Sequence, residues 1–207
     1  MKQYDLALEA FNKTMELDPN DSSLYTLKCL TLNELGQYDL ALEICNLAVK
    51  LTPNDSSIYF LRGLTLRNLD KPNLALEAFN KAIELNPNKW EFYYDKSQVL
   101  VNLKKYELAL EAINNAIKLN NNNPDLFNFK GMILSLLKLH NLAIEAYDKA
   151  IKLTPNNSEF YLSKGAALAE LGKYNLAINA INKALELNPI DPLAQEIKEF
   201  LLKKLNK

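Results

Sequence analysis

Few side chains of this chain are suited to catalysis or to metal binding. The 207 residues include one histidine, His140, and two cysteines, Cys29 and Cys45, which lack the close spacing of a zinc or redox motif. Nucleophilic catalysis needs a nucleophile beside a base and an orienting acid, and we can propose no such set. A glycine-rich phosphate loop is also missing. We therefore predict that the protein is not an enzyme and uses no metal and no cofactor.

The charge of the chain also limits the classes of partner that we expect. Lys and Arg number 24 against 25 Asp and Glu, and the pI is near 6.0. This balance removes the positive field that binders of nucleic acid or anionic membranes carry, so we predict neither partner. The start, MKQYDLALEAF, alternates charged and apolar residues, unlike a signal peptide, and no run approaches a membrane span. We therefore expect a cytoplasmic protein.

The elements that carry these residues follow a repeat of 34 residues. This spacing separates Pro19 from Pro53, Pro53 from Pro87, and Pro155 from Pro189, and the gap between Pro87 and Pro155 is twice as long. In this frame uninterrupted units start at residues 22, 56, 90, 124 and 158. A period of this length indicates a stack of repeated structural units.

Each unit is predicted to form two amphipathic helices, called here helix A and helix B. Apolar residues recur at steps of three and four in both halves of the unit. Gly36 and Gly172 mark the turn between the helices, where other units have Asp70, Lys104 and Lys138. Asn-Pro or Thr-Pro pairs then end helix B, and Ser, Asn or Asp caps the next helix A. The predicted fold class is therefore all-α.

The repeat frame explains the histidine, the cysteines and the acidic residues without a catalytic role. His140 stands where other units have Tyr38, Tyr106 and Tyr174, which indicates a packing position at the start of helix B. Cys29 and Cys45 fall in one hairpin, which could bring them together, but we interpret them as two reduced thiols of the core. The many Asp and Glu residues recur with the repeat, which is typical of solvated helix faces.

Three positions of helix A and two of helix B carry a family pattern. Helix A has an aromatic residue near its start, a small residue four positions later and a leucine three beyond that, as in Tyr25, Cys29 and Leu32. Helix B has small residues at two positions, Ala41 and Ala48 in the first unit. With these residues the chain resembles the tetratricopeptide repeat family over essentially its whole length. The resemblance implies a right-handed superhelical solenoid of stacked antiparallel helix hairpins that binds other proteins.

The frame also predicts how the chain is organised. Residues 1–21 carry only a helix B and form a half repeat, residues 22–189 form the repeat array, and residues 190–207 form a C-terminal capping helix. One face of the last helix is apolar, with Leu193, Ile197, Phe200, Leu201 and Leu205. A solenoid commonly covers its last repeat in this way.

The resemblance further implies that the A helices line a groove for an extended peptide or a partner helix. The fifth, ninth and twelfth residues of each unit are expected to face it. The predicted groove residues are Thr26, Leu30, Asn33, Phe60, Leu64, Arg67, Tyr94, Gln98, Asn128, Met132, Leu162 and Ala166. This lining is mostly apolar. The alternative is that individual members merely pack adjacent A helices.

Family members that clamp a chaperone's C-terminal carboxylate place Lys and Asn in the first unit of the groove. Here Thr26 and Leu30, and then Phe60 and Leu64, take the comparable places, so we expect no such clamp. The asparagine ladder of the sugar-transferase members is missing as well. An apolar ligand fits the lining better than an acidic one.

Two charged ladders also follow the repeat. The basic ladder is Lys28, Arg62, Lys96, Lys130 and Lys164, and the acidic ladder is Glu9, Glu43, Glu77, Glu111 and Glu145. We interpret them as long side chains that cover apolar surface and pair with neighbouring charges. A basic track for an acidic partner is the alternative.

The predicted function is therefore that of a protein–protein interaction module, which binds an apolar peptide or helix of a partner protein in the groove. The alternative is a structural spacer or assembly scaffold without a specific groove ligand. Because the chain starts with a helix B and ends with a helix A, head-to-tail self-association is a further possibility. The sequence does not name the partner.

Overall fold

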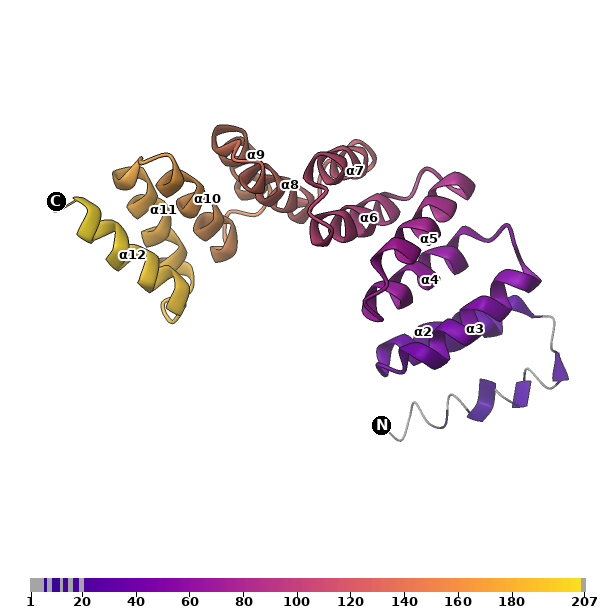
Figure 1. The fold of residues 1–207 in the computed structure, drawn as a ribbon. Helices are drawn as coiled ribbons and strands as arrows, with labels where there is room; N and C mark the ends of the chain where they lie inside the picture. The colour runs from indigo at the N-terminus through magenta and orange to yellow at the C-terminus, as the bar shows by residue number, and fades with distance from the viewer. Residues whose placement is uncertain (1–5, 7–8, 12, 15–16, 19–20, 206–207) are drawn as a thin grey trace. The chain divides into compact units, whose positions relative to one another are not determined.

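The computed structural model describes residues 6, 9–11, 13–14, 17–18 and 21–205, which form helices joined by short turns (Figure 1). The chain divides into two compact units, Met1–Lys104 and Lys105–Lys207. The first unit contains α2 (Ser22–Glu34), α3 (Tyr38–Leu51), α4 (Ser56–Asn68), α5 (Pro72–Leu85) and α6 (Trp90–Asn102). The second contains α7 (Tyr106–Leu119), α8 (Pro124–Leu136), α9 (His140–Leu153), α10 (Ser158–Glu170), α11 (Tyr174–Leu187) and α12 (Pro192–Leu205).

Consecutive helices form antiparallel hairpins that stack within each unit. In the first unit, α2 pairs with α3 and α4 with α5, and α3 packs against α4. In the second, α8 pairs with α9 and α10 with α11, and α12 packs against α11. The even-numbered helices are the A helices and the odd-numbered helices are the B helices. The predicted all-α fold of stacked hairpins is confirmed.

Side-chain caps begin most of the A helices. The backbone N–H of Ser57 donates to Asp55 Oδ1 (2.8 Å) at α4, and that of Glu159 donates to Asn157 Oδ1 (2.9 Å) at α10. Each bond satisfies one of the amide donors that a helix leaves unpaired in its first turn. The predicted capping by Asp and Asn is therefore confirmed at these helices.

The turn between helix A and helix B requires one residue in the left-handed region. Gly36 and Gly172 adopt it with φ of 72° and 71°, and Asp70, Lys104 and Lys138 adopt it with φ of 54°, 57° and 60°. At Lys138 the amide donates to Ser135 O (2.9 Å), and the next amide donates to Leu134 O (2.9 Å). The turn that the sequence predicts from its glycines is thus also present in repeats without glycine. There the left-handed backbone is strained, because the residue carries a Cβ atom.

We expect Lys138→Gly to raise the free energy of unfolding by about 1 kcal/mol, because glycine adopts a positive φ without a steric penalty. Gly172→Ala is the matched opposite change. Nothing lies within 4 Å of a Cβ built at Gly172, so this substitution tests backbone strain alone and is expected to destabilise by about the same amount. Urea unfolding followed by circular dichroism measures both values. Destabilisation by Lys138→Gly would contradict the strained, left-handed conformation assigned to Lys138.

The small helix A position allows the two helices of a hairpin to touch. A Cβ built on Gly63 would lie 2.5 Å from the Phe79 ring, and one built on Gly131 would lie 2.5 Å from the Tyr147 ring. Both rings are buried. The alanines predicted at the two small helix B positions are all fully buried: Ala41, Ala48, Ala75, Ala82, Ala109, Ala116, Ala143, Ala150, Ala177 and Ala184. Close packing therefore depends on the size of these residues.

Cys29 and Cys45 are joined by a disulfide, so the expectation of two reduced thiols is wrong. The small position of α2 faces the bulky position of α3, which places the two Cα atoms 5.8 Å apart, within the range that a disulfide spans. Both residues are buried. Because disulfides are rare in the cytosol, the bond weighs against the predicted cytoplasmic location, which stays a prediction.

The last helix covers the preceding hairpin with only part of the apolar face that was predicted. Ala194 and Leu201 of α12 are buried and Ile197 packs against the same cluster, whereas Phe200 is 53% exposed and Leu193 52% exposed. Ala194, which the prediction did not include, thus packs together with Ile197 and Leu201 of the predicted face. Most of the half repeat predicted at residues 1–21 lies outside the described residues.

Candidate peptide-binding faces

The predicted groove residues lie on the A helices, and none of them is buried. The first A-helix face consists of Thr26, Leu30, Asn33, Phe60, Leu64, Arg67, Tyr94 and Gln98, on α2, α4 and α6. The second A-helix face consists of Asn128, Met132, Leu162 and Ala166, on α8 and α10. Within each unit these A helices are in direct contact. Each unit therefore presents a face built from neighbouring helices.

Two apolar members of the first A-helix face are engaged in packing between repeats. The Phe60 ring stacks on Phe92 with centroids 4.8 Å apart, and it lies 5.8 Å from Phe79 in a tilted arrangement. Leu64 packs against the buried clusters on both sides of α4. The main contacts of these two residues therefore agree with the alternative that they pack neighbouring helices. Leu30, at 41% exposure, is the more accessible apolar side chain.

The second A-helix face is smaller and also apolar. Met132 is 36% exposed, and Leu162 and Ala166 are partly exposed. Leu136, one turn further along α8, is exposed as well. These side chains belong to two A helices that are in contact, so both helices contribute exposed apolar atoms in the second unit.

The polar members of both faces connect neighbouring A helices. Asn33 Nδ2 donates to Thr65 Oγ1 (2.8 Å), and Asn128 Nδ2 donates to Glu159 Oε1 (3.4 Å). The Oδ1 atoms of Asn33 and Asn128 are buried and have no hydrogen-bond partner. Each amide therefore has one acceptor that is both buried and unpaired, which is unusual.

An ion pair that the sequence did not reveal lies on the first A-helix face. Arg67 of α4 pairs with Asp95 of α6, and its Nη1 also donates to Gln98 Oε1 (3.3 Å). Burial raises the pKa of the Asp95 carboxyl, and the charge of Arg67 opposes that shift. In the sequence this ion pair appears only as an aspartate 28 residues after an arginine. That spacing indicates an ion pair only when α4 and α6 are known to be adjacent.

Sequence reasoning also missed two hollows on the other side of the second unit. A cavity of about 300 Å³ lies between α7 and α9 over α8, and one of about 600 Å³ lies between α9 and α11 over α10. Equivalent residues line both, including the basic ladder members Lys130 and Lys164. A signal was present in the leucines that recur in helix B and remain exposed: Leu40, Leu74, Leu108, Leu142 and Leu176.

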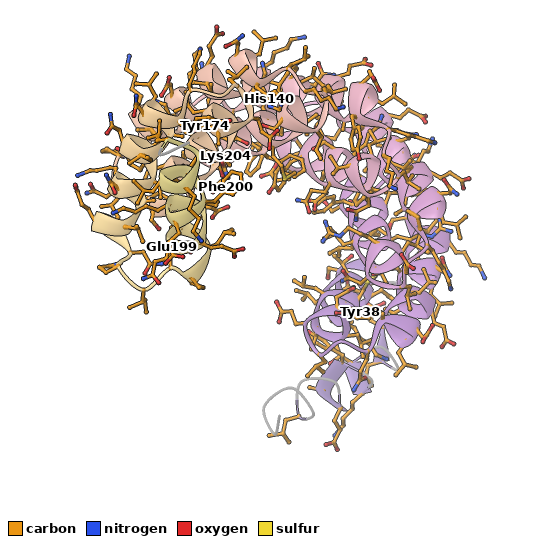
Figure 2. The ribbon with its side chains drawn as sticks, turned by 60° about the vertical axis from the view of Figure 1, so that its left-hand side comes forward. Tyr38, His140, Tyr174, Glu199, Phe200 and Lys204 are labelled. Atoms are coloured by element: carbon orange, nitrogen blue, oxygen red, sulfur yellow. A yellow bond between two sulfur atoms is a disulfide. The ribbon has the colours of Figure 1, made fainter. Side chains whose placement is uncertain are left out.

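The single histidine, His140, begins α9 in the place that Tyr174 takes in α11 (Figure 2). Its side chain is partly buried, and Nδ1 has no hydrogen-bond partner. Within the part of the chain that the structure describes, no group of three His, Cys, Asp or Glu side chains could hold a metal ion. None of the described helices has the length and apolar character to span a membrane.

Comparison with known families identifies the repeat. Residues 22–55, 56–89, 78–111 and 158–191 match models described as tetratricopeptide repeat, and residues 140–172 match one described as TPR repeat. The matched segments lie in both units and together cover more than half of the chain. A search of curated proteins found no match.

Solved structures give the same fold. The chain is similar to YrrB, a TPR protein with an unusual peptide-binding site, at 23% identity over 93% of this chain and 99% of YrrB, with a TM-score of 0.79. It is similar to MamA at 27% identity over 81% of this chain and 92% of MamA, with a TM-score of 0.75. MamA from Desulfovibrio magneticus RS-1 aligns at 23% identity over 83% of this chain and 97% of that one, with a TM-score of 0.77.

Proposed function

Because the chain belongs to the tetratricopeptide repeat family, whose repeats form protein-interaction modules, we propose that its A-helix faces bind an apolar peptide or helix of a partner protein. The observation that carries the proposal is the accessibility of the predicted groove positions. All twelve remain at least partly exposed, although they alternate along each A helix with buried residues. The faces are therefore available to a ligand.

The chemistry of the exposed residues supports an apolar ligand. Leu30 is exposed on α2, and Met132 and the neighbouring Leu136 are exposed on α8. Covering such side chains removes apolar surface from water, which is the main favourable term in protein association. Rigid helices also lose little entropy when a partner covers them.

The polar atoms of the faces offer little to a charged ligand. The unpaired Oδ1 atoms of Asn33 and Asn128 are buried, so a ligand on these faces does not reach them. Arg67 is already neutralised by Asp95, so it offers little attraction to a carboxylate. A peptide with apolar side chains fits these features best.

The test uses two leucines of similar exposure on opposite sides of the first unit. Peptides selected from a phage-displayed random library on the whole chain are titrated by calorimetry into Leu30→Glu and into Leu74→Glu. Leu30 is 41% exposed on α2 and Leu74 is 45% exposed on α5. We expect Leu30→Glu to weaken binding about tenfold, or about 1.4 kcal/mol, because it places a charge in an apolar contact. Leu74→Glu should leave the affinity unchanged.

The second unit provides an equivalent pair, Met132→Glu on the A-helix face and Leu108→Glu on a B helix. Binding to an apolar face should also be nearly independent of salt. Selection of no peptide, or equal loss in both members of each pair, would reject the groove and favour the scaffold role. Phe60 is unsuitable for the test because its substitution would disturb the packing with Phe92.

A further inference from the structure

The hollow over α8 in the second unit combines apolar walls with two cations. We call it the Lys130 furrow; Leu110 and Asn114 of α7, Lys130 of α8, and Leu142, Glu145 and Lys149 of α9 line it. Its volume is about 300 Å³, at the lower end of the range for sites that hold a small ligand or a few side chains. It lies on the B-helix side, so it is independent of the A-helix faces.

The two lysines of the furrow lack an acidic partner. Among the described residues neither forms an ion pair within 4.0 Å, although Glu145 also lines the furrow. Lys149 Nζ lies 5.6 Å from the centre of the Phe127 ring. Burial and then repulsion from Lys149 lower the pKa of Lys130. Because the two ammonium groups repel each other, a negative charge between them would be favourable.

The next repeat shows what is missing. There Lys164, the counterpart of Lys130, forms an ion pair with Asp148 (Nζ–Oδ1, 2.6 Å). The residue 34 positions before Asp148 is Asn114, which lines the Lys130 furrow. An uncharged amide thus replaces the carboxylate at the place from which Lys130 would be paired.

We propose that the Lys130 furrow binds an acidic segment of a partner protein, with a Glu or Asp carboxylate between Lys130 and Lys149 and an aliphatic neighbour against Leu110 and Leu142. The carboxylate supplied by the partner takes the role that Asp148 has at Lys164. The aliphatic contact follows from Leu142, which is exposed at the rim. Such a pair, partly removed from water, is stronger than an exposed ion pair.

The experiment supplies the missing carboxylate by a substitution in the furrow itself. The probe is a short fluorescein-labelled peptide in which Glu and Leu alternate, and its binding to the whole chain is measured by fluorescence anisotropy. Asn114→Asp gives Lys130 the partner that Lys164 has, and we expect it to weaken binding about tenfold, or about 1.4 kcal/mol. Lys130→Met should weaken binding to a similar extent. The same peptide with Gln in place of Glu should bind poorly to the unchanged chain.

Asn115→Asp is the matched control, because it adds the same charge one residue away and Asn115 does not line the furrow. It should bind the probe as the unchanged chain does. Circular dichroism confirms that each variant is folded. Equal weakening by Asn114→Asp and Asn115→Asp, or full binding by Asn114→Asp, would overturn the proposal. Displacement of the probe by millimolar inorganic phosphate would instead assign the furrow to a small anion and likewise overturn it.

Discussion

Gly131→Val in α8 is expected to lower the free energy of unfolding by about 3 kcal/mol, the upper part of the range for overpacked cores. Helix propensity alone would predict no such loss, since valine is a slightly better helix former than glycine. The loss comes from contact with Tyr147 of α9, because even a methyl group at this position would approach its ring to 2.5 Å. The ring is buried in the core with Leu134 and Ala143, so any shift of the ring disturbs its packing against them.

Urea unfolding followed by circular dichroism measures this loss. The control is Asn141→Val at an exposed position of α9, which should change the stability by less than about 1 kcal/mol. The double variant Gly131→Val/Tyr147→Ala should be less destabilised than the sum of the single variants, because removal of the ring removes the clash. Additive effects would show that the Gly131–Tyr147 contact is not the cause.

Reduction of the Cys29–Cys45 disulfide is expected to lower the free energy of unfolding of the first unit by about 3 kcal/mol, since the bond closes a short loop in the unfolded chain. The two cysteines are 16 residues apart and join α2 to α3. Trp90, the only tryptophan, begins α6 in the same unit, so its fluorescence reports the unfolding of that unit.

The control is the double variant Cys29→Ala/Cys45→Ala, whose unfolding should not respond to a reductant. The oxidised protein should also resist a thiol alkylating reagent when it is unfolded without reductant. Labelling of two thiols under those conditions would contradict the disulfide. An unchanged urea midpoint after reduction would show that the bond contributes little to the stability.

Much of this architecture could be predicted from the sequence because its determinants are local. Apolar residues at steps of three and four define each helix, Asp55 and Asn157 cap the helices that follow them, and Gly36 requires the turn after α2. The period of 34 residues then places equivalent residues in equivalent environments. This is why the buried alanines were predicted correctly from the frame, whereas the groove positions stay a prediction.

Other features were decided only by the tertiary structure, because they depend on how close two helices approach. The pairing of Cys29 with Cys45 depends on a Cα separation of 5.8 Å within a hairpin, and the ion pair of Arg67 with Asp95 depends on the contact of α4 with α6. The face of α12 that is buried depends on the fit of Ala194 against α11. Periodicity gives the direction of a side chain around its own helix, whereas the partner it meets depends on distances between helices that no local pattern contains.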